Sequence, residues 1–339
     1  MLKLLKVLGV VLLVLVLLAA VLLALPRPQN YAQDNPMRKD GAMPILIAHG
    51  GGNREFPDNT LEAFYNAYSV DPRVMMETDV SITADGVVIL SHDTTLDRKT
   101  NVTGAIIDWN YADLMAQKVD FGYTNATADG KLVAGSERVR FTTKDGRNVS
   151  PVDVTYPEGV SARDEEVFLA TTLEELIVAF PENRINVEIK QSGDTGMRCL
   201  KEVLRLLEKH NAWDRVVLAS FHDAIYDEYV RMQKAGEVPA CFMYSPATDS
   251  ATRFVILHLL GLDTFFRDGM CVFQLPLKQS GITLNTRYLV WTAHRHNLAV
   301  HYWTINDPDE MRQLIAIGAD GIMTDYPHLL REVYGEGGE

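Results

Sequence analysis

The stretch that decides the fold is ILIAHGGGNREFPDNTLEAF, which runs from Ile45 to Phe64. It opens with a short apolar run that stops at His49 and three glycines, and an amphipathic segment begins about ten residues later. The run is typical of a buried strand and the segment of a helix, for which Asn59 and Glu62 fit the spacing of a capping box. The stretch therefore predicts a strand-turn-helix unit whose glycines permit a tight turn and hold His49 at the end of the strand.

The rest of the chain repeats this alternation. From Pro44 onward, short β-prone runs alternate with segments of helical period, which is typical of a parallel sheet with crossover helices. We therefore expect an α/β fold, a (β/α)8 TIM barrel. The predicted strands are Ile45–Ala48, Val74–Val80, Val87–Ser91, Arg184–Ile189, Val216–Ser220, Ala240–Tyr244, Cys271–Leu275, Ala299–Thr304 and Gly321–Thr324. The predicted helices are Thr60–Ser69, Thr172–Phe180, Thr195–His210, Ala224–Ala235, Tyr288–Asn297 and Asp309–Ile317.

Nine predicted strands are one more than an eight-stranded barrel needs. The excess falls within Val74–His92, where no helix separates two runs and Asp85-Gly86 is a turn dipeptide. A hairpin about that dipeptide would bring Asp79 level with His92. The alternative is that Cys271–Leu275 is a loop.

The composition limits the possible partners. The chain has 339 residues with 32 basic and 45 acidic side chains, a formal charge of −13. Such a surface repels a nucleic-acid backbone, so we expect no nucleic-acid partner. The cysteines Cys199, Cys241 and Cys271 lie far apart and match no metal-binding spacing, so they are expected to be buried apolar residues.

The first residues differ in composition from the rest. Val7–Leu25 carries no charge and would form a helix of about 28 Å, roughly the hydrocarbon thickness of a bilayer. A cleaved signal peptide is the competing interpretation, but no A-x-A-like site follows. We expect a transmembrane anchor at 1–26, a polar tether at 27–43 and a barrel at 44–334 outside the cytoplasm. Within the barrel, residues 122–170 are expected to be an insertion with a hairpin about Asp145-Gly146 over the barrel mouth. Loops of this length are commonly lids or disordered.

Polar side chains stand at the predicted strand ends, where barrel enzymes place their chemistry. Residues two apart in a strand share a face, so Glu77 points with Asp79, and Glu188 with Lys190. Burying carboxylates costs free energy unless a cation neutralises them, and oxygen ligands suit Mg2+ or Ca2+. Glu188 and Lys190 could also form an internal ion pair, which is compatible with metal binding. The remaining strand-end residues are His49, His92, His222, Trp303 and Asp325. We expect His222 to support the site and Asp325 to cap the next turn. Trp303 is either a wall of the substrate site or part of the core packing.

Several motifs, taken in order, carry a resemblance to a known family. They are IAHGGGNREFPDNTLEAF, METDVSITADGVVILSHDTTLDRKT, TTLEEL, VEIK, LASF, YWTIND and GADGIMTDYP. Together they resemble the glycerophosphodiester phosphodiesterase family over about Ile45–Pro327. The longer region before the last two motifs, with VILHLLGLDTFF, resembles the membrane-anchored, lysophospholipase D-like members.

The resemblance implies a barrel that hydrolyses the phosphodiester between glycerol 3-phosphate and an alcohol. It implies a divalent cation, Mg2+ or Ca2+, as cofactor, with a glycerophosphodiester or lysophospholipid substrate and contact with membrane lipid. The family's metal carboxylates fall on Glu77, Asp79 and Glu188, its acid/base histidines on His49 and His92, and its phosphate-side lysine on Lys190.

One departure from the family concerns the phosphate. The family's opening motif is His-Arg-Gly, whereas this chain has His49-Gly50-Gly51, so a guanidinium is missing. Arg54 is a candidate to reach the phosphate in its place. Cleavage needs charge neutralisation, a base for the attacking hydroxyl and an acid for the leaving alkoxide, and two imidazoles can fill the last two roles in either order. The attacking hydroxyl belongs to water or to C2 of the substrate's glycerol.

Three functions fit the sequence. The first is metal-dependent hydrolysis of glycerophosphodiesters or lysophospholipids on a membrane anchor. The second is a phospholipase C or sphingomyelinase D type enzyme of the same barrel group, and the third is a lipid- or phosphate-binding relative without turnover. The apolar stretch Phe254–Phe266 is a candidate for contact with acyl chains or the bilayer, with a buried loop-helix as the alternative.

Overall fold

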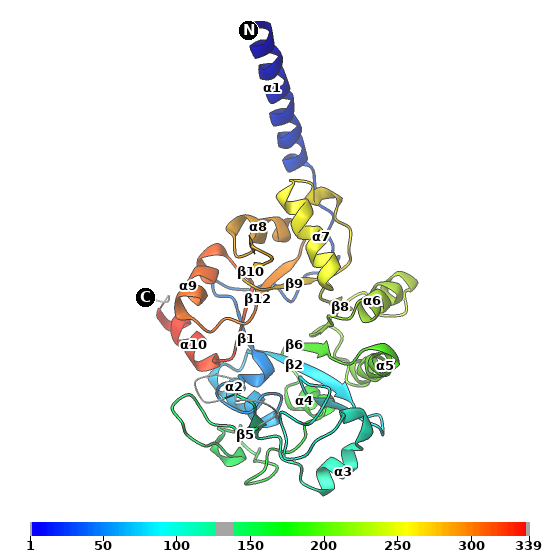
Figure 1. Cartoon of the computed structure of the whole chain (residues 1–339), viewed down its shortest axis with the longest axis vertical. Helices are drawn as coiled ribbons and strands as arrows, with labels where there is room; N and C mark the ends of the chain where they lie inside the picture. The colour runs from blue at the N-terminus through cyan, green and yellow to red at the C-terminus, as the bar shows by residue number, and fades with distance from the viewer. Residues whose placement is uncertain (1, 127–137, 337–339) are drawn as a thin grey trace.

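The computed structural model describes residues 2–126 and 138–336 (Figure 1). Eight strands follow one another in the order β8-β7-β6-β2-β1-β13-β12-β9, and all of these pairs are parallel. The two end strands nearly close the barrel: the amide of Cys271, just before β9, donates to the carbonyl oxygen of Tyr244 in β8 at 3.2 Å. The predicted TIM barrel is confirmed. Its strands are β1 (Ile45–Ala48), β2 (Met75–Ile82), β6 (Ile185–Ile189), β7 (Val216–Ala219), β8 (Met243–Tyr244), β9 (Val272–Leu275), β12 (Ala299–Tyr302) and β13 (Gly321–Thr324).

The ninth strand is the predicted hairpin partner, and Cys271–Leu275 is a strand rather than a loop. β3 (Val88–Leu90) pairs antiparallel with β2, with Val80 opposite Leu90. The predicted register was wrong by one residue: the amide of Ser91, not His92, lies level with Asp79 and donates to its carbonyl oxygen at 2.9 Å. The reason is that the turn is centred on Asp85 itself rather than on the Asp85-Gly86 bond.

Helices surround the barrel (Figure 1). Six correspond to the predicted ones: α2 (Leu61–Val70), α4 (Leu173–Ala179), α5 (Gly193–Lys209), α6 (Asp223–Ala235), α8 (Arg287–Arg295) and α9 (Pro308–Ile317). Three were not among the predicted helices: α3 (Tyr111–Ala116), α7 (Thr248–Leu259) and α10 (Pro327–Glu336). α3 is too short for a helical period to show in a sequence window. Short 3-10 turns are η1 (His49–Gly51), η2 (Ile106–Asp108), η3 (Pro151–Asp153) and η4 (Asp263–Phe265).

The cap of α2 differs from the predicted one. Thr60, not Asn59, is the N-cap, and its hydroxyl accepts from the Ala63 amide at 3.2 Å. Asn59 takes a left-handed conformation, with φ of 57°, and its side chain turns toward the barrel. The predicted Asn59–Glu62 capping box was therefore wrong, because the side-chain amide of Asn59 forms hydrogen bonds with residues of β2 instead.

Residues 27–43, which we call the N-terminal strap, pack against the barrel. Tyr31 and Met37 are buried in a cluster with barrel-interior residues such as Ile47 and Met323. The Asn35 amide donates to the carbonyl oxygens of Cys271 at 2.7 Å and Asn297 at 2.8 Å. The polar composition suggested a tether, but these side chains hydrogen-bond to backbone groups at the barrel's amino-terminal end, so the strap is ordered by packing.

α1 (Leu2–Ala24) precedes the strap and extends away from the barrel (Figure 1). Its length and apolar composition are sufficient to cross a membrane, and a signal sequence would pass the same test. Most of its leucine and valine side chains are exposed, including Leu4 and Leu17.

The predicted insertion is described only in part, because residues 127–137 lie outside the described residues. β4 (Tyr123–Thr124) pairs with β5 (Val139–Arg140), and a bridge joins Thr142 to Asn148 around the predicted turn at Asp145-Gly146. A second small hairpin, β10 (Lys278–Gln279) with β11 (Ile282–Thr283), follows β9.

Candidate active site

A cavity opens at the carboxyl ends of the barrel strands and collects most of the predicted site residues. Its lining includes His49, Glu77, Asp79, His92, Glu188, Lys190 and Trp303. Arg54 does not line this cavity; it borders a separate pocket with Glu55, Lys144 and Tyr326. Among the residues that the structure describes, the cavity lining therefore includes one lysine and no arginine, so none of them places a guanidinium there for the one missing at Gly50.

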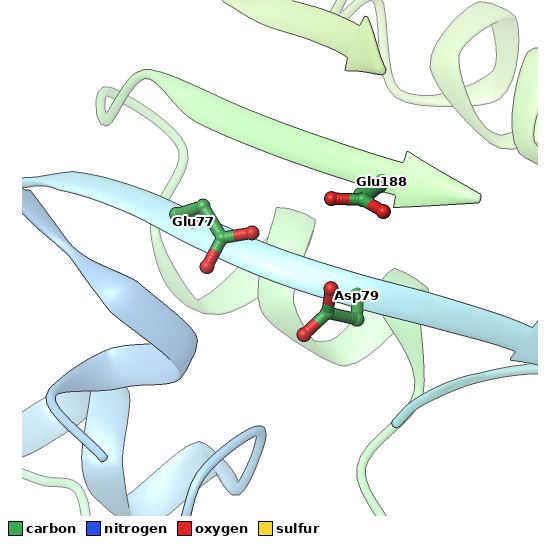
Figure 2. Close-up of side chains that lie close together, drawn as sticks. All are labelled: Glu77, Asp79 and Glu188. Atoms are coloured by element: carbon green, nitrogen blue, oxygen red, sulfur yellow. The ribbon is translucent and has the colours of Figure 1, made fainter. Parts of the chain in front are cut away.

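Three carboxylates converge in the cavity. Glu77 and Asp79 project from β2, and Glu188 projects from the neighbouring strand β6 at the position paired with Asp79 (Figure 2). One oxygen from each lies within 4.8 Å of the others. Burial raises the pKa of Glu77 to about 8, and repulsion from Asp79 acts in the same direction. Burial also raises the pKa of Glu188, although Lys190 opposes the shift.

This donor set fits a hard divalent cation. Two of these carboxylates are buried and Glu188 is partly buried, so their negative charges repel one another, and a cation among them would remove that repulsion. Oxygen ligands are those that Mg2+ and Ca2+ prefer. The cation would be held by Glu77, Asp79 and Glu188.

Lys190 supplies a fixed positive charge beside this cluster. Its Nζ lies 3.1 Å from an Asp79 oxygen and 2.8 Å from a Glu188 oxygen. Burial alone would lower the pKa of Lys190, but the two carboxylates outweigh burial and raise it. The lysine is therefore protonated. His222, which was predicted to support the site, lies with its Nε2 2.9 Å from the Lys190 carbonyl oxygen and does not itself line the cavity.

Asn59 fixes the position of Asp79. Its side-chain oxygen accepts from the Thr78 hydroxyl at 2.7 Å and from the Asp79 amide at 3.1 Å. Its side-chain nitrogen donates to an Asp79 carboxylate oxygen at 3.0 Å. Asn59 itself is 1% exposed, so water does not compete for these bonds.

The glycine turn places His49 at the rim. Gly50, Gly51 and Gly52 all have positive φ, at 54°, 86° and 97°. A Cβ on Gly51 would lie 2.7 Å from the Ala63 Cβ, so only glycine allows α2 to approach this closely. The Gly50 amide donates to a Glu77 oxygen at 2.9 Å, which ties the turn to the carboxylate cluster.

Asp325 orients the His49 ring. Its Oδ1 lies 2.6 Å from His49 Nδ1, and its Oδ2 accepts from the Asn306 amide at 2.7 Å. Burial lowers the pKa of His49, but the hydrogen bond to Asp325 and the charges of Glu77 and Asp79 raise it to about 10 overall. The prediction that Asp325 caps the following turn was wrong. The side chain that accepts from the Tyr326 amide is that of Thr324, at 3.1 Å.

His92 also contacts a carboxylate, Asp93, which is itself ion-paired with Arg98. Its Nδ1 lies 2.9 Å from an Asp93 oxygen, and Arg98 holds the other Asp93 oxygen at 2.6 Å. The hydrogen bond to Asp93 raises the pKa of His92. The ring is 51% exposed, so it remains accessible to a ligand in the cavity.

Several lining residues were missed by the sequence analysis. Asn186 and Gln274 lie in the cavity and are joined by a hydrogen bond of 2.7 Å from the Gln274 amide to the Asn186 carbonyl oxygen. Asn186 is two residues before Glu188 on the same strand face, and Gln274 is the polar residue in the apolar run VFQL, so both had a signal in the sequence. Ser220, Phe221, Ser245 and Pro246 complete this side of the cavity, and they follow strands rather than lie in them.

An apolar groove adjoins the cavity. Four residues, Phe221, Pro246, Gln274 and Trp303, border both spaces. Beyond them the groove runs between α7 and the β10–β11 hairpin, where it is lined by Ala251, Val255, Ile256, Leu275, Pro276, Ile282 and Leu284. Trp303 therefore forms a wall between the two spaces rather than packing only in the core.

The comparisons with known proteins agree with this geometry. Residues 49–329 match the glycerophosphoryl diester phosphodiesterase family. A probable glycerophosphodiester phosphodiesterase 2 of Mycobacterium tuberculosis is 26% identical over 309 residues, which cover 87% of this chain and 96% of that protein. Lysophospholipase D GDPD1 of Homo sapiens is 26% identical over 313 residues, which cover 84% of each chain.

Solved structures share the fold. The glycerophosphoryl diester phosphodiesterase domain of a Mycobacterium tuberculosis protein aligns with a TM-score of 0.61 at 17% identity, covering 86% of this chain and 98% of that one. An Oleispira antarctica phosphodiesterase, solved in complex with the product sn-glycerol-3-phosphate, aligns with a TM-score of 0.56 at 19% identity, covering 86% and 97%. The family match spans nearly the whole barrel, and this chain belongs to the glycerophosphoryl diester phosphodiesterase family.

Proposed function

We propose that this protein is a divalent-metal-dependent hydrolase of glycerophosphodiesters and lysophospholipids. It releases an alcohol together with glycerol 3-phosphate or lysophosphatidic acid. The observation that carries the proposal is the convergence of three carboxylates, one lysine and two histidines on a single cavity. A structural ion pair or ordinary core packing would not explain two imidazoles at the rim of the cavity, each oriented by a carboxylate.

The site residues have separate roles in cleavage of the phosphodiester. Glu77, Asp79 and Glu188 would hold the divalent cation, which would supply charge neutralisation at the phosphate. Lys190 adds a second positive charge at the same place and stabilises the charge that develops on the phosphate oxygens. Asp325 keeps the His49 proton on Nδ1, which leaves Nε2 as the nitrogen that exchanges a proton with the substrate.

His49 and His92 form the acid/base pair. One takes the proton of the attacking hydroxyl, which belongs to water or to the glycerol 2-hydroxyl, and the other protonates the leaving alkoxide. Both are supported by a carboxylate, Asp325 for His49 and Asp93 for His92, so both keep a fixed ring orientation.

The lysophospholipid part of the proposal rests on the apolar groove. An acyl chain needs an apolar surface that reaches the phosphate site, and the groove shares Phe221 and Trp303 with the cavity. The similarity to a human lysophospholipase D supports the same substrate class. We further propose that α1 is an uncleaved anchor that holds the barrel at an extracytoplasmic membrane surface.

The test is an activity panel on the full-length protein. Glycerophosphocholine and lysophosphatidylcholine are offered with Mg2+, with Ca2+ and with EDTA, and the released head group is identified. We expect choline release that disappears with EDTA and returns with the metal. Glu77→Gln and His49→Ala are expected to reduce it to a small residual rate. Glu202→Gln on the outer face of α5, where Glu202 pairs with Arg205, serves as the matched control.

Other outcomes point to the other functions. Release of phosphocholine in place of choline would show cleavage of the other phosphoester bond, as in a phospholipase C. If the metal-loaded protein binds lysophosphatidylcholine but hydrolyses neither substrate, the barrel is a lipid-binding relative without turnover.

A further inference from the structure

The end of α1 is fastened to the barrel by a buried ion pair. Arg27 contacts Asp263 of η4 through two hydrogen bonds, Nε to Oδ2 at 2.5 Å and Nη2 to Oδ1 at 3.0 Å. Both side chains are 1% exposed. His296 at the end of α8 contacts the same carboxylate at 3.2 Å. A bidentate pair shielded from water in this way fixes geometry as well as charge.

The same region caps the last turn of α1. A helix leaves its final carbonyl groups unpaired unless other groups satisfy them. Here the Arg27 guanidinium donates to the carbonyl oxygens of Leu22 at 2.8 Å and Leu25 at 2.6 Å. Arg295 of α8 donates to the Leu25 carbonyl oxygen at 2.9 Å, and the Thr264 hydroxyl to that of Pro26 at 3.3 Å. The direction in which α1 leaves the barrel is therefore set by α8 and η4 rather than by a free linker.

The barrel surface on this side is apolar and aromatic. Six large side chains on α7, η4, α8 and the turn after α7 are exposed, between 46% and 64%. We call them the docking face: Ile256, Leu259, Leu260, Phe265, Tyr288 and Trp291. Figure 1 shows that α1 rises from the side of the barrel on which α7 and α8 lie.

The charge of this side is opposite to that of the whole chain. Residues 248–268 and 286–297 together contain four arginines and three aspartates, Asp249, Asp263 and Asp268. Arg27 neutralises Asp263, and Arg253 pairs with Asp268. The chain overall carries 45 acidic against 32 basic residues. An apolar surface with aromatic rings and more arginines than aspartates is the composition that a lipid interface with anionic head groups favours.

We propose that the docking face rests on the bilayer, so that the barrel lies on its side against the membrane in one orientation. This orientation depends on the anchor role proposed above for α1. The partner that covers the docking face is the lipid bilayer that α1 enters. The observations that carry it are the rigid connection at Arg27 and Asp263, the exposed apolar and aromatic side chains next to it, and their local excess of arginine.

This orientation has a consequence for the substrate. Ile256 belongs both to the docking face and to the lining of the apolar groove. The groove therefore opens where the bilayer would lie, and it ends at Phe221 and Trp303 beside the cavity. A lysophospholipid would enter the groove from the membrane without crossing water.

The test measures which tryptophan touches lipid. Full-length protein is reconstituted in vesicles of phosphatidylcholine and phosphatidylglycerol, with or without bromine-labelled phosphatidylcholine, which quenches tryptophan fluorescence at short range. The chain has four tryptophans, and Trp291 is the one in the docking face. We expect the labelled lipid to quench the wild type, Trp291→Phe to lose most of that quenching, and the control Trp109→Phe, close to α3, to keep it.

A pair of charge variants tests the face itself. Leu260→Glu places a carboxylate in the docking face, and Val178→Glu places one on α4; the two parent side chains are 64% and 58% exposed, so neither variant disturbs the core. We expect Leu260→Glu alone to reduce quenching and to lower hydrolysis of lysophosphatidylcholine in vesicles. Hydrolysis of soluble glycerophosphocholine should be unchanged in both variants.

The outcomes separate this proposal from the enzymatic one. Equal quenching in Trp291→Phe and wild type, or equal behaviour of Leu260→Glu and Val178→Glu, would overturn the docking proposal while soluble hydrolysis continued. Isolation of a mature chain that begins after residue 25 would overturn it as well. Quenching at Trp291 without hydrolysis of either substrate would uphold docking and contradict the proposed function.

Discussion

The side-chain amide of Asn59 binds both the backbone and the carboxylate of Asp79, at 3.1 Å and 3.0 Å. Asn59 lies in the loop after the glycine turn, so it connects the loop that carries His49 to the strand that carries two of the candidate metal ligands. An outer residue that holds a ligand carboxylate in place contributes to metal affinity without touching the metal.

The first prediction follows from this contact. Asn59→Gly keeps the left-handed backbone but removes the amide, and we expect the metal concentration for half-maximal activity to rise by about 10- to 100-fold. Activity at saturating metal should recover largely. The matched control is Asn211→Gly, at another asparagine of positive φ, 48°, outside the cavity. An unchanged metal requirement in Asn59→Gly would show that Asp79 needs no such support.

The second prediction concerns the carboxylate behind His49. Asp325→Asn removes the negative charge and leaves one accepting oxygen for two donors, His49 and Asn306. The proton is then no longer held on Nδ1, and we expect kcat to fall by about 100-fold or more. Because Asp325 acts through His49, adding the substitution to His49→Ala should have little further effect. Asp309→Asn, on the outside of α9, is the control. Additive losses in the double variant would assign Asp325 a separate role.

The third prediction tests the groove with a bulky side chain. Ala251 lines the groove on α7, and Ala251→Trp should obstruct it. We expect KM for lysophosphatidylcholine to rise with acyl-chain length, whereas the constants for glycerophosphocholine stay the same. The control, Ala112→Trp, is on the exposed side of α3. An equal loss on both substrates would mean that the substitution distorts the cavity and that the groove does not select acyl chains.

The fourth prediction compares two glycines. Gly51 and Gly146 both have positive φ, at 86° and 81°, so an alanine at either is expected to cost about 1 kcal/mol in backbone strain. A Cβ on Gly146 meets nothing within 4 Å, whereas one on Gly51 collides with Ala63. Gly51→Ala should therefore lose additional unfolding free energy and most activity, as chemical denaturation and a kinetic assay would show. Equal effects of the two substitutions would contradict the packing argument.

The fifth prediction concerns pH and the N-terminal strap. His301 Nε2 donates to the Met37 carbonyl oxygen at 2.7 Å, and its Nδ1 is buried without a partner. Burial lowers the pKa of His301 below its ordinary value of 6.5. Below pH 6.5 the unfolded chain binds a proton that the folded chain does not, so this contribution to stability is complete above that pH and is lost as the pH falls.

The measurement is the melting temperature between pH 7 and pH 5. We expect it to decrease more, or to increase less, on acidification in the wild type than in His301→Gln, whose amide keeps a donor toward Met37. Glu77 and His92, whose pKa values are raised, add stability as the pH falls in both proteins. His258 and His296, whose pKa values are also lowered by burial, continue to contribute in both proteins. Identical pH dependence of the two proteins would show that His301 is not a source of acid instability.

Local patterning in the sequence was sufficient for the barrel and for much of the site. Short apolar runs that alternate with helical segments leave few architectures, and a polar residue at a strand end falls at the same rim whichever strand it follows. For this reason Glu77, Asp79 and Glu188 could be placed together from their positions in the strands alone. The period of two along β2 and β6 set which of their neighbours point into the barrel.

The tertiary structure decided everything that depends on contacts between distant segments. Asn59 looked like a helix cap because the capping motif is local, but its partner is Asp79 on another element. Asp325 looked like a turn residue until the fold brought it to His49, 276 positions away. Residues 27–43 looked like a tether because polar composition says nothing about which backbone groups a side chain will meet. Sequence fixes local periodicity, whereas hydrogen-bond partners across the barrel exist only once the strands have closed around them.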